Sequence, residues 1–508
     1  MSNRTGGPFS NIHTYICMNN LVFLLALIPI AATQAEDKPA PKVSDYYTLE
    51  EIPIPKGEMI EVGGTEWMPD GRLAVSTRRG EIWMIHNALG DDPKKVEFKR
   101  YAHGLHEVLG IAYNKKDGFL YACERGAITR IKDRDKDGVA DLFENHSDGW
   151  GISGNYHEYA FGSKFDPEGY LWVVLCLTGS GAADANTPFR GWGMRISPEG
   201  VAKPICSGVR SPGGIGQDSK GRMYYADNQG PWNGTSSIKW MKPGSFTGNP
   251  KGNIWYDLAP DMKKPAEYES GGRIADAMQK IPEYQPPVAQ LTHGVLGRST
   301  SGIICDMTRG KFGPFSEQLF VCDQGHSNIV RIFVEEANGY LQSATFRFMD
   351  NGFGSGNLVG VFAPDGSFFI GGTNRGWGSR GKKPGAVDRV RWTRKVPFEV
   401  LEMRVQSDGW ELEFTHPVDP ETAADKASYS MKTHAYIFKS SYGSPEVDKT
   451  DAIIESVTVK DEKTVRLRVK GMVIGSIHTL KMEALRSKDG LPLLHNTAYY
   501  TLNQIPKE

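Results

Sequence analysis

MPDGRLAVSTRRGEIWMI, at residues 68–85, is the stretch that decides the fold. It joins a turn containing glycine, a short apolar strand, a polar turn and a second strand. Five related stretches follow: NKKDGFLYACERGAITRI at 114–131, DPEGYLWVVLCLTG at 166–179, DSKGRMYYADNQG at 218–230, GPFSEQLFVCDQGHSNIVRI at 313–332 and APDGSFFIGGTNRGWG at 363–378. The turn glycines of the first four copies recur about every 50 residues, a period typical of propeller blades.

Six copies predict an all-β chain that contains a six-bladed β-propeller over residues 49–395. Residues 231–300 interrupt the repeat, and we expect a long insertion there with one short helix at 272–280. Residues 396–508 show a different pattern, with alternating strands expected at 410–415, 464–469 and 478–484. Their spacing predicts an immunoglobulin-like β-sandwich.

The N-terminal region carries an apolar run, LVFLLALIPIAA, at residues 21–32. This run is too short for a membrane span but fits a signal peptide, with cleavage after Ala35. We therefore expect a signal peptide over 1–35, a linker over 36–48 and a secreted or periplasmic protein. A second long apolar run does not follow, so the mature chain is expected to have no membrane span.

Charge and cysteine content exclude several classes. The formal net charge is -1 at pH 7, which gives no basic excess for nucleic acid or an anionic membrane. The cysteines beyond the signal peptide lack the C-x-x-C spacing of zinc sites and the C-x-x-C-H motif of c-type haem. The sequence therefore predicts neither a zinc site nor a covalently bound haem. We interpret them as core thiols with at most one or two disulfides: Cys123, Cys176, Cys206, Cys305 and Cys322.

An acidic loop, DRDKDGVADLFE at 133–144, fits the calcium-loop pattern D-x-[DN]-x-[DN]-G-x5-E at every defined position. Calcium takes six to eight oxygen ligands, and this spacing supplies carboxylates, a turn glycine and a backbone carbonyl. The predicted ligands are Asp133, Asp135, Asp137, Val139, Asp141 and Glu144. A solvated acidic turn is the alternative interpretation.

Four further motifs follow in order. They are Asn155-Tyr156-His157 ahead of FDPEGYLW, Gly208-Val209-Arg210-Ser211-Pro212, Gln229-Gly230-Pro231, and KPGSFTGNP at 242–250. Together with the repeat, these motifs resemble the glucose/sorbosone dehydrogenase family, which includes soluble quinoprotein glucose dehydrogenases and related secreted bacterial proteins. The resemblance covers about residues 55 to 395.

The resemblance implies a dehydrogenase of sugars or alcohols that uses pyrroloquinoline quinone (PQQ) and calcium and passes electrons to an acceptor. It implies that His157 is the catalytic base, and Arg210 would stabilise developing negative charge. Gln229, Gly230 and Pro231 would bind the cofactor, with the carbonyls of Gly230 and Pro231 on its calcium.

The sequence departs from the family at two basic positions. Gln324 stands where the family places a lysine, and Gly356-Asn357-Leu358 stands where it places an arginine pair. Since the quinone carries three carboxylates, it needs basic partners. Arg375, Arg298 and Arg125 are the candidates, whereas Arg78 and Arg79 are interpreted as a solvated turn.

Two other classes of function remain open. One is a calcium-dependent carbohydrate lyase or hydrolase that uses His157, a tyrosine and Arg210 for proton chemistry without a redox cofactor. The other is a non-catalytic propeller that binds glycans or proteins. In that case turn-borne tryptophans would serve as sugar-stacking platforms: Trp150, Trp192, Trp232 and Trp377.

Overall fold

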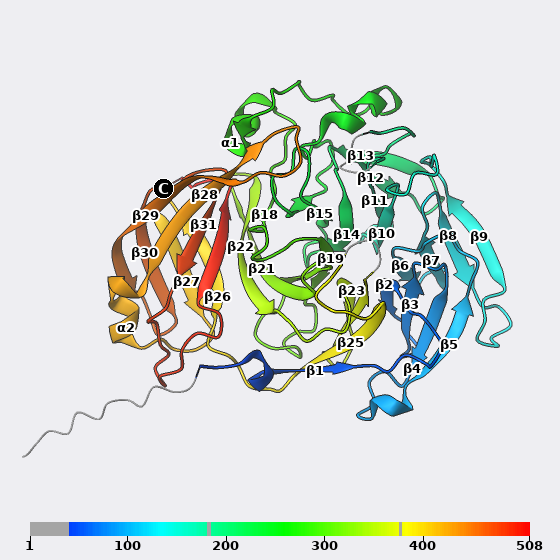
Figure 1. Cartoon of the computed structure of the whole chain (residues 1–508), viewed down its shortest axis with the longest axis horizontal. Coiled ribbons are helices and arrows are strands. Elements are labelled where there is room, and N and C mark those ends of the chain that lie inside the picture. Colours follow the sequence, from blue (N-terminus) through cyan, green and yellow to red (C-terminus); the bar gives the residue numbers. More distant parts are fainter. Residues whose placement is uncertain (1–39, 180–183, 375–377, 508) are drawn as a thin grey trace, which may run out of the picture. The chain divides into compact units, whose positions relative to one another are not determined.

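The computed structural model describes residues 40–179, 184–374 and 378–507. The expected signal peptide lies outside these residues. Five separate four-stranded antiparallel sheets form most of the N-terminal three quarters of the chain (Figure 1).

The first three sheets each use four consecutive strands. They are β2 Val62–Trp67, β3 Leu73–Thr77, β4 Ile82–His86 and β5 Glu97–Ala102; β6 Ile111–Asn114, β7 Phe119–Cys123, β8 Ile128–Lys132 and β9 Leu142–Ser147; and β10 Ala160–Phe165, β11 Leu171–Leu175, β12 Trp192–Ile196 and β13 Ala202–Ser207. The next sheet contains β14 Pro212–Gln217, β15 Met223–Asp227, β16 Ser237–Trp240 and β18 Ala289–Gln290.

The last separate sheet joins the two ends of the repeat region. It contains β23 Asn357–Phe362, β24 Phe368–Thr373, β25 Gly385–Trp392 and the N-terminal strand β1 Tyr47–Glu51. β1 pairs antiparallel with β25, from Tyr47 opposite Trp392 to Glu51 opposite Asp388. The N-terminal strand thus completes the sheet formed by the last copy of the repeat. The range 36–48 expected as a linker therefore includes the short helix η1 Val43–Asp45 and the first residues of β1.

The prediction of six separate blades is wrong, since five four-stranded sheets stand alone among the described residues. The strands of the fifth copy are β19 Thr300–Cys305, β20 Leu319–Asp323, β21 Asn328–Ala337 and β22 Tyr340–Met349. They belong to a twelve-stranded sheet, because β22 continues into β32 Thr497–Leu502, with Ser343 opposite Thr501. The inner strand β19 still contacts β14 on one side and β23 on the other, so it completes the ring of inner strands.

The interruption at 231–300 is shorter than expected, because β16 and β18 lie inside it. Between them run η3 Pro250–Leu258, β17 Gly272–Arg273 and α1 Ile274–Lys280, and this last element confirms the expected helix. A further short helix, η2 Pro93–Lys95, lies between β4 and β5.

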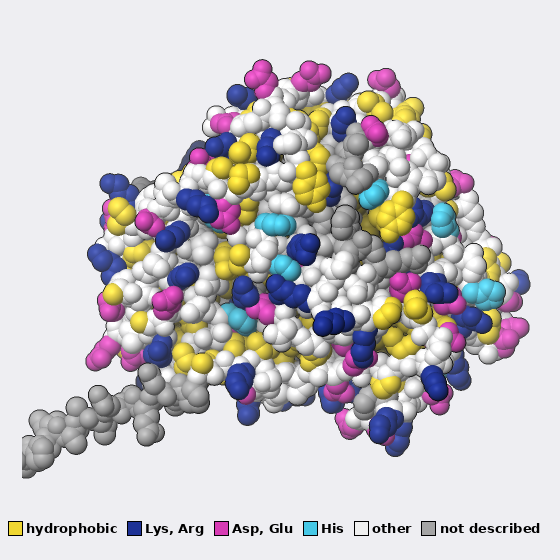
Figure 2. Space-filling model, in the orientation of Figure 1, with side chains coloured by type: hydrophobic (Ala, Val, Ile, Leu, Met, Phe, Trp, Pro, Cys, Tyr) yellow, Lys and Arg dark blue, Asp and Glu magenta, His cyan; other side chains and the backbone are white. Residues whose placement is uncertain are grey.

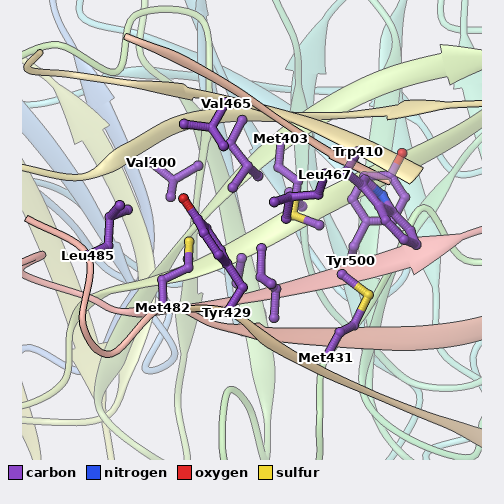
Figure 3. Packing of buried hydrophobic residues seen from close by; sticks show 14 of the residues in the cluster. Val400, Met403, Trp410, Tyr429, Met431, Val465, Leu467, Met482, Leu485 and Tyr500 are labelled. Carbon is purple, nitrogen blue, oxygen red and sulfur yellow. The ribbon is translucent and has the colours of Figure 1, made fainter. Parts of the chain in front are cut away.

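The C-terminal strands form two layers around one core. They are β26 Val400–Gln406, β27 Gly409–Phe414, β28 Ser430–Phe438, β29 Glu446–Val459, β30 Thr464–Lys470, β31 Ser476–Lys481 and β32, with the helices α2 Pro420–Ala424 and η4 Lys426–Ser428. Side chains such as Met403, Trp410, Met431, Leu467 and Tyr500 pack together between the layers (Figure 3). The immunoglobulin-like connectivity stays a prediction.

Glycines let the inner strands approach one another closely. A Cβ at Gly64 would lie 2.8 Å from Cα of Gly110, one at Gly110 would lie 1.4 Å from the carbonyl oxygen of Gly162, and one at Gly214 would lie 2.7 Å from the amide nitrogen of Gly302. In Figure 1 the inner strands β2, β10, β14, β19 and β23 gather around a common centre. Only residues without a side chain fit at these crossings.

The cysteines confirm the expectation of core thiols for the most part. All five that the structure describes are free, and four are buried, while Cys305 is partly exposed. Burial raises the pKa of Cys206 to about 12, so its thiol stays protonated at neutral pH.

We predict that Gly110→Ala destabilises the protein by at least about 3 kcal/mol, because its new methyl group meets backbone that cannot move aside. Gly126→Ala is the control, since a Cβ there would meet only Ile152 at 3.5 Å. Thermal unfolding of both variants measures the difference. Equal melting temperatures would show that the ring relaxes without cost.

Candidate functional site

The loop that carries His157 joins β9 to β10 and is held by a buried arginine. Arg190 is fully buried, and its guanidinium donates to the carbonyl oxygens of Gly151 at 2.9 Å, Tyr159 at 2.9 Å and Arg125 at 3.0 Å. Burial lowers the pKa of Arg190 to about 10, so it keeps its charge at neutral pH. These bonds fix both ends of the loop against the neighbouring sheet.

His157 is partly buried between aromatic and basic side chains. Its ring centroid lies 5.3 Å from that of Tyr156 and 6.4 Å from that of Tyr159. Partial burial, followed by the positive charges of Arg210 and Arg125, lowers the pKa of His157 below its ordinary value of 6.5. The imidazole is therefore neutral at neutral pH and can accept a proton.

Tyr156 lies beside His157 and is half exposed, whereas its neighbour Tyr159 is more deeply buried. The pKa values of the two phenols shift in opposite directions. Partial burial acts to raise its pKa, but a side-chain hydrogen bond with Tyr159 and the charge of Arg78 outweigh this and lower it. Burial and the same hydrogen bond raise the pKa of Tyr159. Tyr156 is consequently the more acidic phenol of the pair.

Arg78 belongs to this site, so its interpretation as a solvated turn is wrong. Its side chain is mostly buried and pairs with Glu107, which also binds Arg125. The guanidinium carbon of Arg125 lies 4.8 Å from the ring centroid of Tyr159, and that of Arg78 lies 5.4 Å from it. Beside them is a cavity of about 450 Å³, lined also by Tyr156 and His106. Sequence reasoning missed this packing, because Arg78 precedes a turn glycine and looks exposed.

Glu158 follows the turn formed by Tyr156 and His157 and faces the interior, where it is 1% exposed. Its carboxylate accepts hydrogen bonds from the amide of Ser153 at 2.6 Å, the hydroxyl of Ser153 at 2.8 Å and the hydroxyl of Thr178 at 3.1 Å. It therefore serves to hold the loop.

Arg210 lies beside His157 and is 6% exposed. Its Nε is buried without a hydrogen-bond partner among the residues that the structure describes. Gly230 backs this side chain, since a Cβ there would lie 2.2 Å from Nε. Tyr442, from the hairpin between β28 and β29, covers it with its ring centroid 5.2 Å from the guanidinium carbon. The C-terminal region thus reaches the candidate site, which the sequence did not predict.

In the Gln229-Gly230-Pro231 segment, the Gly230 carbonyl has no free lone pair for a cofactor's calcium, while the Pro231 carbonyl keeps one. The carbonyl of Gly230 accepts from the amides of Asn233 at 3.1 Å and Gly443 at 3.2 Å. The carbonyl of Pro231 accepts from Nδ2 of Asn249 at 3.2 Å.

The central cavity between the inner strands is also small. Its volume is about 70 Å³, and its lining includes Ser211, Asn228 and Gln324. This volume is far below the roughly 300 Å³ or more of ordinary ligand pockets. This cavity therefore does not fit PQQ, and the Gly230 carbonyl does not fit its calcium, in the way that the resemblance implies.

Of the other predicted basic partners, Arg298 is not among the charges that shift the pKa of His157. Arg298 is exposed, and its positive charge, like that of Arg380, lowers the pKa of the buried His326 after burial itself. Arg375 lies outside the described residues, as does Trp377. In Figure 2 histidine, lysine and arginine side chains gather near the middle of the face drawn.

Two of the tryptophans predicted as platforms are core residues, because Trp150 is 4% and Trp192 is 0% exposed. Their indole nitrogens donate to the carbonyls of Arg125 and Gly252. Trp232 is partly exposed and lines a separate pocket.

The acidic loop brings three of its predicted ligands together. Carboxylate oxygens of Asp133, Asp135 and Asp137 lie within 4.8 Å of one another. Asp133 also accepts from the amides of Lys136 and Gly138, which curls the loop around the carboxylates.

The remaining predicted calcium ligands are not part of that group. Asp141 pairs with Arg134 at 3.2 Å, and Glu144 pairs with Arg130 at 2.6 Å. Val139 follows the turn glycine and is 48% exposed. Three convergent carboxylates fit a hard cation such as calcium, while the other two are engaged by arginine.

Comparison with known proteins gives one family match. The family model described as "Domain of unknown function (DUF7133)" matches residues 70–352. None of the curated proteins matches the chain.

Several solved structures are similar. A putative oxidoreductase (glucose dehydrogenase) from Thermus thermophilus is 19% identical, with a TM-score of 0.48 over 68% of this chain and 99% of that chain. The PQQ-bound aldose sugar dehydrogenase from Streptomyces coelicolor is 18% identical, with a TM-score of 0.45 over 68% and 98%. The apo form of the soluble aldose sugar dehydrogenase from Escherichia coli is 15% identical, with a TM-score of 0.45 over 68% and 99%. At identities this low, the similarity does not show that this chain shares the activity of those proteins.

Arg210→Gln is predicted to raise the pKa of His157, because it removes a positive charge that disfavours the protonated imidazole. In the wild type the neutral base is lost only as the pH falls through the lowered pKa, and in the variant this loss begins at higher pH. Titration of the His157 Cε1 proton by NMR measures the change. Arg468→Gln, at an exposed C-terminal arginine, is the control, and an equal pKa in both variants would contradict the assignment.

Proposed function

Because the chain belongs to the DUF7133 family, whose description assigns no function, we propose one from the site itself: proton-transfer chemistry on an acidic glycan. A lyase that cleaves uronate-containing chains by β-elimination fits the site best. The observation that carries this proposal is a neutral His157 next to Tyr156 within a rim of arginines.

The roles follow from the chemistry of elimination. His157 removes the C5 proton of a uronate unit, while Arg210 holds its carboxylate and, together with the charge of Arg125, stabilises the negative charge that develops. The electron pair forms the C4–C5 double bond, and the bond from C4 to the glycosidic oxygen breaks. Tyr156 gives its proton to that oxygen. Atoms and charge balance without an oxidant.

Glycoside hydrolysis is less well supported, because it needs two available carboxyl groups at the scissile bond. Glu107 is bound by Arg78 and Arg125, and Glu158 accepts three hydrogen bonds from Ser153 and Thr178. A quinone-dependent sugar dehydrogenase with His157 as base would need the carbonyls of Gly230 and Pro231, which already accept hydrogen bonds from Asn233, Gly443 and Asn249. The proposal therefore keeps His157 as the base and replaces hydride transfer by elimination.

A calcium ion in the loop at 133–144 is part of the same proposal, held first by Asp133, Asp135 and Asp137. Release of Glu144 from Arg130 would supply the late carboxylate that such loops use. Export from the cytoplasm would expose the protein to glycans and to calcium. None of the helices among the described residues is long and apolar enough to cross a membrane.

The activity test incubates the full mature chain with polygalacturonate, alginate and a neutral glucan. We expect a rise in ultraviolet absorbance from the new double bond with one of the two acidic polymers. His157→Ala should reduce the rate by about 100-fold or more and Tyr156→Phe by a similar factor. His86→Ala, in β4, is the matched control.

Two outcomes would reject the elimination. One is that neither acidic polymer is cleaved. The other is that the protein, given PQQ and calcium, reduces a dye with a neutral sugar in a reaction that needs His157. The second outcome would restore the dehydrogenase implied by the resemblance.

Calcium binding is tested separately by calorimetry and thermal unfolding after chelation. Calcium at about 100 times its dissociation constant should stabilise the protein by about 2.7 kcal/mol. Asp135→Asn should weaken binding at least tenfold, because it removes one of three convergent charges. Asp91→Asn, at a side chain 98% exposed, is the control. Equal calcium affinity in the two variants would contradict the calcium site and support the alternative interpretation of the loop as a solvated acidic turn.

A further inference from the structure

A second pocket lies between the insertion and the C-terminal hairpin. Its volume is about 360 Å³, within the size range of small-molecule sites. Four aromatic side chains line it: Trp232, Phe246 and Tyr268 from the insertion and Phe438 from the C-terminal region. None of these residues takes part in the proposed elimination.

The aromatic floor is rigid. Phe246 and Phe438 are each 3% exposed and belong to one buried cluster with residues of α1. The ring of Phe438 lies 5.0 Å from Trp232 at 63° and 5.5 Å from Tyr268 at 56°. Trp232 and Tyr268 are only partly buried, so part of each ring is available to a ligand.

Trp232 is held in a conformation that bulky residues rarely adopt. Its φ is 60°, and its amide donates to the carbonyl of Lys439 at 2.7 Å. Left-handed backbone at a large side chain costs of order 1 kcal/mol or more and persists only where surrounding contacts impose it. Here the imposing contact comes from the hairpin, which places the indole at the pocket.

Polar groups accompany the aromatic walls. Oδ1 of Asn253 is buried and has no hydrogen-bond partner among the residues that the structure describes. Lys264 and Glu267 are exposed and also line the pocket. An apolar floor with a free acceptor and charged groups at the edge matches a pyranose, which has apolar C–H faces and hydroxyl donors around its rim.

The hairpin connects this pocket to the candidate site. Phe438 forms a wall of the pocket, and four residues later Tyr442 covers Arg210. The hairpin is tied to the insertion by Arg273 with Asp448 at 2.6 Å, and to Gly230 by the amide of Gly443. Trp232 itself directly follows the Gln229-Gly230-Pro231 segment that backs Arg210.

We infer that the pocket lined by Trp232, Tyr268 and Asn253 is a subsite for a second sugar ring of the glycan whose uronate unit lies at His157. This inference rests on the proposed function and narrows its substrate class to oligosaccharides and longer chains. A monosaccharide would fill only one of the two sites.

The test uses an array of defined neutral and acidic mono-, di- and longer oligosaccharides with the labelled full-length protein. Binding of at least one longer oligosaccharide and weak binding of its monosaccharide are expected. Calorimetry with that oligosaccharide should show at least tenfold weaker binding for Tyr268→Ala and for Asn253→Ala, while Tyr268→Phe retains binding. Tyr340→Ala, at the start of β22, is the control for loss of a partly buried phenol.

The outcomes separate this inference from the proposed function. His157→Ala should abolish cleavage and keep oligosaccharide binding, because His157 does not line the second pocket. Cleavage that is unaffected by Tyr268→Ala and Asn253→Ala would overturn the subsite and leave the lyase standing. Binding that depends on Tyr268 without any cleavage would reject the lyase and keep the subsite. Absence of binding to every longer oligosaccharide would overturn the subsite.

Discussion

The close backbone approach of the inner strands is the constraint on which the rest of the structure depends. Gly64, Gly110, Gly214 and Gly302 stand where a side chain would collide with the backbone of the neighbouring strand. The ring they permit is so tight that the two cavities lined by these strands measure only about 70 Å³ and about 20 Å³. Chemistry on this scaffold must therefore take place on the loops at the rim, where His157, Arg78 and Arg210 lie.

Three buried arginines bind neighbouring segments in the same way, by donating hydrogen bonds from the guanidinium to backbone carbonyls. Arg190 binds carbonyls of the His157 loop, Arg331 binds those of Val400 at 2.7 Å and Leu401 at 3.2 Å, and Arg389 binds those of Ala88 at 2.7 Å and Gly90 at 2.9 Å. A guanidinium offers five donors in a fixed plane, which suits several carbonyls at once. These arginines join the site loop, the C-terminal strands and the closing sheet to neighbouring segments.

Local features were predictable from the sequence, and pairings between distant segments were not. Five of the six copies supply strands of separate four-stranded sheets and the other supplies strands of the twelve-stranded sheet, because glycine turns and apolar strands leave a local signature in the sequence. The short helix in the insertion was also predicted, because a helix too is encoded by consecutive residues. The extension of β22 into β32 depends on segments about 150 residues apart, so the repeat pattern could not indicate it.

The candidate site shows the same limit. His157 and Arg210 were predicted from motifs, and in the folded chain the positive charge of Arg210 adds to burial in lowering the pKa of His157. Arg78 and Tyr442 were missed, because each acquires its position through contacts between distant loops. Gln229-Gly230-Pro231 matched a motif, yet the amides of Gly443 and Asn233 use the Gly230 carbonyl. A motif specifies residue types, whereas the availability of their atoms depends on what packs against them.

The hairpin between β28 and β29 joins the C-terminal region to both the candidate site and the aromatic pocket. Its tip covers Arg210 with Tyr442, its base supplies Phe438 to the aromatic pocket, and its amide at Gly443 uses the carbonyl of Gly230. One element thus changes the chemistry available at the rim and builds a surface beside it. A face shaped for a single small cofactor would gain nothing from such a neighbour, but a face that binds an extended glycan needs contacts on both sides of the reacting unit. The position of the hairpin therefore favours a polymeric substrate on structural grounds that are independent of the base.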